Sequence, residues 1–363
     1  VLESYYSSKS DGFVKLVESF TSNRGDSELT AIIKDIYRFI LSNPEPFKWL
    51  REKVEDNNLS ESDFSGSLWL KAVKENLNIL LNGAEEGLQW AINVCDEPDG
   101  PFVYKETLLE DLNGVNRLKK LLCEDFQEFI YNLHLFSFPS LKTLRGKQKD
   151  GVSPEKQEDV KFLRDEYKKI INNIKKSIPN KNIGEFISDI NYMYQPMHTL
   201  YQLIYDIDME FKARKIEKAI ADFNDVEHYA LQILRNKDVG ERYKNKFKYI
   251  FIDEYQDSNR LQEELLNSIK RDNNLFMVGD VKQSIYRFRL ADPTIFNEKC
   301  TNYPVNGDNS INRRIDLTQN FRSRKEILSG INFIFSKIMN KDIGEVTYNS
   351  DVYLNPGAEF KES

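Results

Sequence analysis

The sequence predicts an α/β protein, with a parallel sheet in its second half and an all-helical region in its first half. Two short apolar runs, residues 249–252 and 275–278, have the length and composition of strands in such a sheet. Residues 260–270 between them carry apolar side chains on one helical stripe, which completes a strand–helix–strand unit. Because helices cover both faces of a parallel sheet, we expect both strands to be buried on both faces.

Acidic and amide side chains follow these strands, at the edge of the sheet where ligands of α/β proteins bind. Asp253 and Glu254 end the first strand, and Gln283 follows the second. Two adjacent acids suit nucleotide hydrolysis, since one can hold Mg²⁺ through water while the other activates the attacking water. The acids could instead cap the next helix, but Asn259 and Gln262 already form a capping-box pattern there.

A third strand is expected at Ile315–Thr318, leading into the polar segment Gln319–Arg324. Upstream of the sheet, Asp222 or Asn224 is expected to cap a helix that ends near Leu234. Each expected strand is therefore followed by groups that suit a nucleotide site: carboxylates, then a glutamine, then an arginine.

Residues 1 to about 205 predict helices nearly throughout, because apolar residues recur there at spacings of three or four. Such stripes are packing surfaces, and Trp49, Trp69 and Trp90 are expected in the core or at an interface. A long periodic stretch begins at Ile183, and Pro196 is expected to kink or break its helix.

The composition predicts a soluble globular protein of two or more domains, since 40% of its 363 residues are hydrophobic and 30% are charged. No apolar run has membrane-spanning length. The scattered cysteines and histidines argue against a disulfide framework or a metal cluster and fit a reducing cytoplasm. They are Cys95, Cys123, Cys300, His134, His198 and His228. A net charge of −7 argues mildly against a dedicated nucleic-acid binder, although a motor can bind DNA through a local groove.

The basic stretch Leu141–Lys149 has two interpretations. Its basic residues could contact a DNA backbone from a loop. The acidic residues that follow it favour the other interpretation, a solvated connection between helices.

Three segments resemble the second, third and fourth motifs of the UvrD/Rep-type helicases, in the same order and at similar spacing. They are Asp253–Asp257, Gly279–Asp280 with Gln283–Tyr286, and Gln319–Ser323. Asp222–Val226 resembles the Asp-Phe-x-Asp-Leu element that this family carries upstream of them. The longer string Val278–Phe296 is similar to the AddA (RexA) family, which provides the A-subunit of the bacterial helicase–nuclease that processes double-strand breaks.

This resemblance implies an incomplete RecA-like P-loop motor domain with a large all-α helical insertion, followed by the start of a second RecA-like domain. The implied domains are a helical insertion at residues 1–205, the C-terminal part of the first motor domain at 206–308, and the start of the second at 309–363. The Gly-rich loop ending in Gly-Lys-Ser/Thr, which such motors need, is absent from these residues. We therefore expect an internal fragment that does not hydrolyse ATP at a motor-like rate by itself.

The resemblance also implies site residues for ATP and Mg²⁺. Asp253 would hold the metal, and Glu254 would activate the attacking water. Gln283 would sense the γ-phosphate, and Arg322 would neutralise charge that develops in the transition state.

The resemblance also implies four DNA-binding residues, which follow Gln283 in the sequence. Tyr286 and Phe288 would stack bases of single-stranded DNA, although each ring could equally pack in the core. Arg287 and Arg289 would pair either with DNA phosphates or with Asp280.

The implied partners are single-stranded and duplex DNA and the B-subunit of a helicase–nuclease heterodimer. The complete protein is expected to have exonuclease activity, to be cytoplasmic and not to bind a membrane. One alternative is a stand-alone UvrD-type helicase without a nuclease. Another is a truncated, catalytically silent DNA-binding or scaffold protein.

Overall fold

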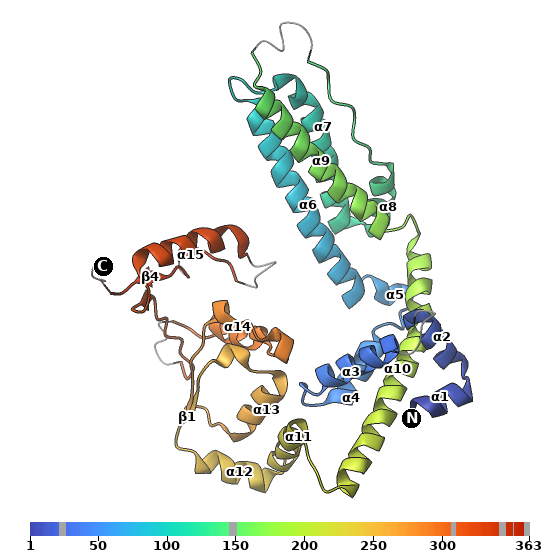
Figure 1. Ribbon diagram of the computed structural model, residues 1–363, viewed down its shortest axis with the longest axis vertical. Helices are drawn as coiled ribbons and strands as arrows, with labels where there is room; N and C mark the ends of the chain where they lie inside the picture. Colours follow the sequence, from blue (N-terminus) through green and yellow to red (C-terminus); the bar gives the residue numbers. More distant parts are fainter. Residues whose placement is uncertain (22–26, 145–150, 306–309, 341–345, 351, 359–363) are drawn as a thin grey trace. The chain divides into compact units, whose positions relative to one another are not determined.

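The computed structural model describes residues 1–21, 27–144, 151–305, 310–340, 346–350 and 352–358. The chain divides into two compact units (Figure 1). One unit joins Val1–Val54 with Pro196–Ser363, and the other is Glu55–Gln195. Most of the described residues are helical, and residues 1 to about 205 contain helices nearly throughout, as predicted.

The unit Glu55–Gln195 is a helical bundle. Its long helix α6 (Leu68–Cys95) packs against α7 (Lys105–Glu124) and α9 (Pro154–Ser177), and α8 (Phe126–Leu135) follows α7 (Figure 1). The short α5 (Glu61–Phe64) and the 3₁₀ turn η1 (Phe102–Tyr104) precede and follow α6. Apolar residues at helical spacing meet in one core, among them Leu81, Leu88, Leu108, Val115, Val160 and Ile171. Of the basic stretch Leu141–Lys149, residues 145–149 lie outside the described residues.

Helix α10 (Ile183–Glu217) passes through Pro196 without a break. Of the expected kink or break, the break is therefore wrong, and the kink stays a prediction. Proline removes one backbone donor, but apolar residues are buried on either side of it, at Ile190 and Leu200. This burial offsets the lost hydrogen bond. The boundary between the two compact units falls at this proline.

Four helices begin the other unit and pack with the second part of α10. They are α1 (Leu2–Ser8), α2 (Asp11–Phe20), α3 (Ser27–Ile40) and α4 (Pro46–Glu55). Their core contains Phe13, Leu16, Leu29, Ile33, Leu203 and Ile204. Residues 1–54 thus share a compact unit with the α/β part, whereas the predicted division groups them with the helical insertion. The domain limits 1–205, 206–308 and 309–363 stay predictions.

The α/β part contains a parallel pair of strands, β1 (Ile250–Ile252) and β2 (Leu275–Met277), joined by α13 (Arg260–Ile269). Helices α11 (Phe223–Leu234) and α12 (Lys237–Lys246) pack on α13, and α14 (Pro293–Asn302) follows β2. Both predicted strands and the connecting helix are confirmed. The capping box of Asn259 and Gln262 is also present.

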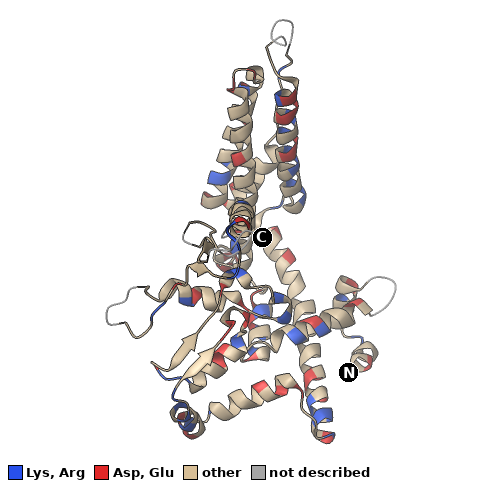
Figure 2. Cartoon of the chain, turned by 60° about the vertical axis from the view of Figure 1, so that its left-hand side comes forward, with Lys and Arg blue, Asp and Glu red and all other residues tan. Residues whose placement is uncertain are grey.

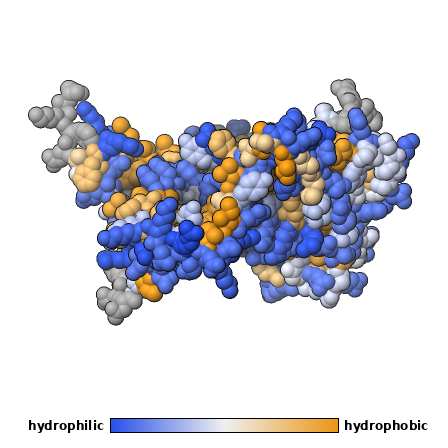
Figure 3. Space-filling view, turned by 90° about the horizontal axis from the view of Figure 1, so that it is seen from below, coloured by the Kyte–Doolittle hydropathy of each residue, from blue (hydrophilic) through white to orange (hydrophobic). Residues whose placement is uncertain are grey.

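The expectation that both faces of this sheet are buried is wrong for the described residues. Phe251 is 73% exposed and Phe276 is 52% exposed, with their ring centroids 5.9 Å apart. The residues on either side of Phe251 and Phe276 in their strands are partly buried. The described elements therefore cover only one face of this pair of strands. Apolar residues also lie among hydrophilic ones in the space-filling view of Figure 3. Of the three tryptophans, Trp49 and Trp69 pack against the two cores, whereas Trp90 is exposed.

The third predicted strand is misplaced. Residues 315–318 are not a strand, and β3 (Gln319–Asn320) begins after them and pairs in parallel with β4 (Asn355–Pro356), with α15 (Lys325–Ile338) between them. Leu317 is 88% exposed. Within the described ranges no strand lies beside residues 315–318, so their backbone lacks the partners that a strand requires.

Acidic and basic residues are interspersed along the helices in Figure 2, which fits the moderate net charge. Among the helices of the described ranges, none combines the length and the apolar content needed to cross a bilayer.

Candidate functional site

Asp253 and Glu254 lie at the carboxyl end of β1, beside the end of β2. The backbone pairing continues past the strands, because the Val278 N–H donates to Ile252 O at 2.8 Å and the Tyr255 N–H donates to Val278 O at 2.9 Å. Both acidic residues are exposed. This edge of the sheet therefore presents two carboxylates to solvent.

Glu254 has a left-handed backbone conformation, with a φ of 50°. This conformation costs a non-glycine residue about 1–3 kcal/mol and persists where the surroundings hold it. Here Asp253 Oδ1 accepts the Glu254 N–H at 3.0 Å, and the 3₁₀ turn η3 (Tyr255–Asp257) follows at once. The Tyr255 side chain is 1% exposed and packs edge-on against Phe296. These contacts hold the turn that carries the Glu254 carboxylate.

Asp257 is the least exposed of the three acids in this segment. Burial raises the pKa of Asp257, and the negative charge of Glu254 raises it further. Its Oδ1 atom is buried and has no hydrogen-bond partner among the residues that the structure describes. The acids that an incoming ligand can reach are therefore Asp253 and Glu254.

Gln283 lies in the turn that follows β2, at the same edge of the sheet. This 3₁₀ turn, η4 (Val281–Gln283), is capped by Asp280, whose Oδ1 accepts the Lys282 N–H at 3.0 Å. Gln283 Nε2 donates to Asp280 Oδ2 at 3.2 Å, and Lys282 Nζ lies 3.0 Å from Asp280 Oδ1. The Gln283 residue is exposed, so its side chain is accessible to solvent at this edge of the sheet.

Gln256 connects the two loops, and we did not predict this role from the sequence. Its side chain donates from Nε2 to Glu254 Oε2 at 2.7 Å and accepts the Asp280 N–H at Oε1 at 3.0 Å. The residue is 1% exposed. Gln256 stands within the motif-like string after β1, but its partner Asp280 is 24 residues away, and only the fold brings the two together.

Arg322 follows β3 in a turn organised by Asn320. Asn320 Oδ1 accepts the N–H groups of Arg322 and Ser323, each at 2.9 Å. The Arg322 residue is exposed, and no hydrogen bond or ion pair within the described part of the chain joins it to Glu254 or Gln283. The convergence of Arg322 on the acids therefore stays a prediction.

The two predicted stacking rings are exposed neighbours. Tyr286 and Phe288 have ring centroids 5.9 Å apart and exposed fractions of 37% and 75%. The Arg289 guanidinium carbon lies 5.2 Å from the Tyr286 centroid and 5.6 Å from that of Phe288. Phe288 is therefore not a core residue in this chain. For Arg287, both expected partners, DNA phosphates and Asp280, remain predictions.

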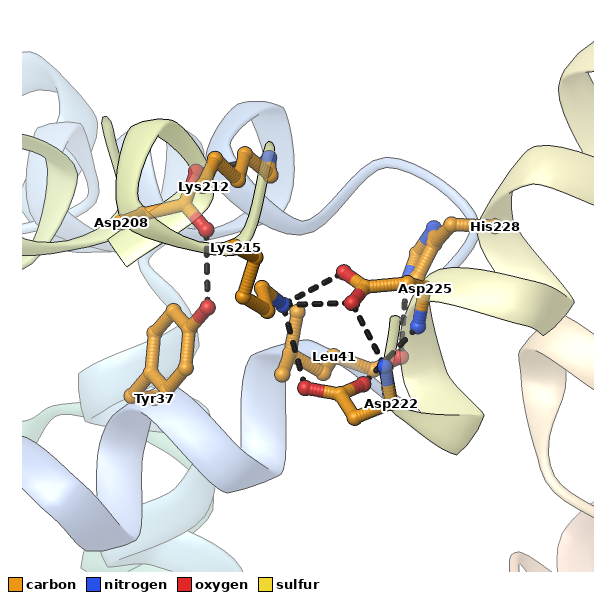
Figure 4. Close-up of polar contacts among 8 residues, drawn as sticks. All are labelled: Tyr37, Leu41, Asp208, Lys212, Lys215, Asp222, Asp225 and His228. Carbon is orange, nitrogen blue, oxygen red and sulfur yellow. Dashed lines mark hydrogen bonds and ion pairs between the residues drawn. The ribbon is translucent and has the colours of Figure 1, made fainter. Parts of the chain in front are cut away.

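The Asp222–Asp225 element caps α11, as predicted for Asp222, and also builds a buried ionic cluster (Figure 4). Lys215 Nζ lies 2.6 Å from both carboxylate oxygens of Asp225 and 3.1 Å from Asp222 Oδ2. The side chains of Lys215 and Asp225 are each 8% exposed. Burial would lower the pKa of Lys215, but the two carboxylates outweigh it and raise that pKa.

Figure 4 also shows that α3 and its C-terminal end meet α10 and α11 around this cluster. The Tyr37 hydroxyl donates to Asp208 Oδ1 at 2.8 Å, and the His228 Nε2–H donates to Leu41 O at 3.0 Å. Next to Leu41, Ser42 O accepts the Leu261 N–H of α13 at 2.9 Å. The helix that starts after the Asp253–Glu254 turn is thus tied to a segment more than 200 residues earlier in the sequence.

The exposed acids fit Mg²⁺. This ion is usually bound through one or two carboxylates together with water and substrate phosphates, so a complete protein cage is not required. Asp253 is suited to hold it, because its carboxylate is exposed and stands at the strand end.

Comparison with known proteins connects this geometry to one family. Residues 82–304 match the UvrD/REP helicase N-terminal domain. The chain is 44% identical over 361 residues to the A-subunit of the ATP-dependent helicase/nuclease from Alkaliphilus oremlandii, an alignment that covers 99% of this chain and 30% of the relative. It is 39% identical over 373 residues to the protein of the same name in Listeria innocua, covering 100% of this chain and 30% of the relative.

The chain therefore spans about 30% of the length of these relatives. The likeness confirms the resemblance that the motifs after β1, β2 and β3 indicate. The chain belongs to the UvrD/Rep helicase family.

Proposed function

We propose that this chain is part of the A-subunit of an ATP-dependent helicase/nuclease and carries part of its DNA motor. The observation that carries the proposal is the placement of Asp253 and Glu254 beside the Asp280–Gln283 turn, at the carboxyl edge of β1 and β2. Relatives of that name align with nearly the whole chain, which supports it.

In this proposal the parallel pair β1–β2 is part of a first RecA-like domain, and β3, α15 and β4 start a second one. The helical bundle is an insertion within the first domain. Its function would be to contact duplex DNA ahead of the motor or to meet a partner protein.

Hydrolysis of ATP is assigned to four side chains. Asp253 would hold Mg²⁺, and the bound ion would supply positive charge that neutralises the phosphates of ATP. Glu254 accepts a proton from the attacking water, and Gln283 donates to the γ-phosphate. Arg322, from the second domain, neutralises the charge of the transition state.

Single-stranded DNA is assigned to the exposed rings after Gln283. Bases stack on aromatic faces without sequence preference, and each stack contributes about 1–3 kcal/mol. Tyr286 and Phe288 are exposed and adjacent, and Arg289 adds a positive charge over both rings. Gln283 is only three residues before Tyr286. A movement of Gln283 on contact with the γ-phosphate can therefore shift the rings that bind DNA.

The complete protein is proposed to pair with a B-subunit, forming a cytoplasmic helicase–exonuclease that acts in the repair of double-strand breaks. A stand-alone helicase would unwind DNA without such a partner. A silent scaffold would bind DNA but would not hydrolyse ATP.

The test uses the complete protein with Glu254→Gln. We expect DNA-stimulated ATP hydrolysis and unwinding to be lost while ATP binding is kept, because the amide can no longer accept the proton. Glu241→Gln is the control, since Glu241 is an exposed residue of α12 that pairs with Lys244 at 3.0 Å. Unchanged ATP turnover in Glu254→Gln would contradict the proposal. If unwinding and degradation of DNA both require the B-subunit, the stand-alone helicase is excluded.

A further inference from the structure

The Gln256 side chain is an almost fully buried polar group between two exposed loops. It is 1% exposed, although Glu254 and Gln283 on either side of it are open to solvent. A buried amide must satisfy its hydrogen bonds within the protein. The partners of this amide therefore determine its orientation.

Those partners exclude the flipped amide. The backbone N–H of Asp280 can only donate, so it must face Oε1, at 3.0 Å. The Oε2 atom of the Glu254 carboxylate accepts, so it must face Nε2, at 2.7 Å. One rigid planar group thus joins the loop after β1 to the loop after β2.

Gly279 allows this close approach. A Cβ at Gly279 would lie 2.5 Å from Gln256 Oε1 and 2.9 Å from Phe296 Cε1, which is shorter than real side chains tolerate. The backbone of the second loop is therefore packed directly against the amide. Asp280, the next residue, also accepts from Gln283 Nε2 at 3.2 Å.

We propose that Gln256 is a positioning residue that orients the Glu254 carboxylate and couples it to the turn that carries Gln283. This inference rests on the proposed function and deepens it. The donor Nε2 holds Glu254 Oε2 in one place, so the other oxygen is free to face the attacking water. A shift of the Asp280–Gln283 turn, as on contact with a γ-phosphate, moves Oε1 and with it the carboxylate.

The test compares complete proteins that carry Gln256→Met or, as the control, Gln232→Met. Methionine keeps the length of the side chain but cannot hold either loop, whereas Gln232 is an exposed residue of α11. We expect Gln256→Met to lower kcat for DNA-stimulated ATP hydrolysis by about 10–100-fold, since a misplacement of about 1 Å costs as much as 10²-fold. The KM for ATP should stay within about threefold, because Gln256 does not touch the nucleotide.

Gly279→Ala disturbs the same amide from the opposite side and keeps the inference testable if one variant folds poorly. It should also lower kcat more than it changes KM. The loss of kcat in the double variant should be smaller than the product of the two single losses, because both changes break the same link.

The outcomes separate this inference from the function on which it rests. Full turnover in Gln256→Met, together with lost turnover in Glu254→Gln, would overturn the role of Gln256 alone. Additive losses in the double variant would also overturn it. Full turnover in Glu254→Gln would instead remove the proposed function.

Discussion

Replacement of Lys215 by methionine tests whether a buried ion pair holds α10 against α11. The substitution keeps an apolar side chain of similar length and removes the ammonium group. Asp225 would lose two contacts of 2.6 Å while its side chain stays 8% exposed. The Asp222 side chain is 42% exposed, so water replaces its contact with Lys215 at little cost.

The size of the effect follows from the burial of Asp225. Removal of one partner from a buried ion pair costs about 3–5 kcal/mol, because the other charge remains buried and uncompensated. At 1.36 kcal/mol per tenfold change, the opening equilibrium of this region should rise by about 10²–10⁴-fold. Hydrogen exchange measured by mass spectrometry on the 363-residue chain should show this acceleration in peptides from residues 208–226.

Arg214→Met is the matched control, one residue away on the same helix. Arg214 Nε lies 2.7 Å from Glu210 Oε1, but the two side chains are 68% and 48% exposed. Such a surface pair contributes about 0.3–0.5 kcal/mol, so exchange should change by about twofold. Equal protection in the Lys215→Met and Arg214→Met chains would refute the reasoning that burial gives the Lys215 contact its strength.

Three further predictions concern the motor and the ion pair. If Arg322 has its proposed role in the transition state, Arg322→Ala in the complete protein should lower kcat by about 10³–10⁵-fold in an ATP hydrolysis assay. Tyr286→Ala or Phe288→Ala should each weaken binding of single-stranded DNA by about 1–3 kcal/mol in a fluorescence titration, with ATP binding unchanged. The folded pKa of Asp222 is lowered, so its contribution to stability is present above the ordinary value of 3.8 and is lost as the pH falls through the folded pKa. The folded pKa of Lys215 is raised, so its contribution to stability is present below 10.5 and is lost as the pH rises through the folded pKa. The urea midpoint should therefore fall less steeply at alkaline pH in Lys215→Met than in the unchanged chain.

Local patterns predicted the central unit of the fold. The strands Ile250–Ile252 and Leu275–Met277, the helix between them and its capping box depend on neighbouring residues, which the sequence shows directly. The strand expected at residues 315–318 depends on a partner strand. Its apolar pattern could not show that the pairing with β4 begins at Gln319.

The candidate site was predictable to a similar extent. The acids after β1 and the glutamine after β2 follow from the rule that ligands bind at the carboxyl ends of parallel strands. The bridge through Gln256 was not predictable from the residue type, because a glutamine next to two acids is compatible with a solvated surface. Its burial depends on the closeness of Gly279 and Asp280, which is a tertiary property.

The family resemblance implies that residues 1–54 belong to the helical insertion, and that grouping stays a prediction. Apolar spacing identifies helices but does not identify their partners. The first helices share an apolar core with the second part of α10, and polar contacts of long sequence separation, such as Tyr37 with Asp208 and Ser42 with Leu261, add to it. Leu261 lies at the start of α13, the helix that follows the 3₁₀ turn after Asp253 and Glu254. The segment after α3 therefore contacts the helix next to the loop that carries the acids. Variants that weaken these contacts should therefore affect the motor before they affect the bundle of residues 55–195.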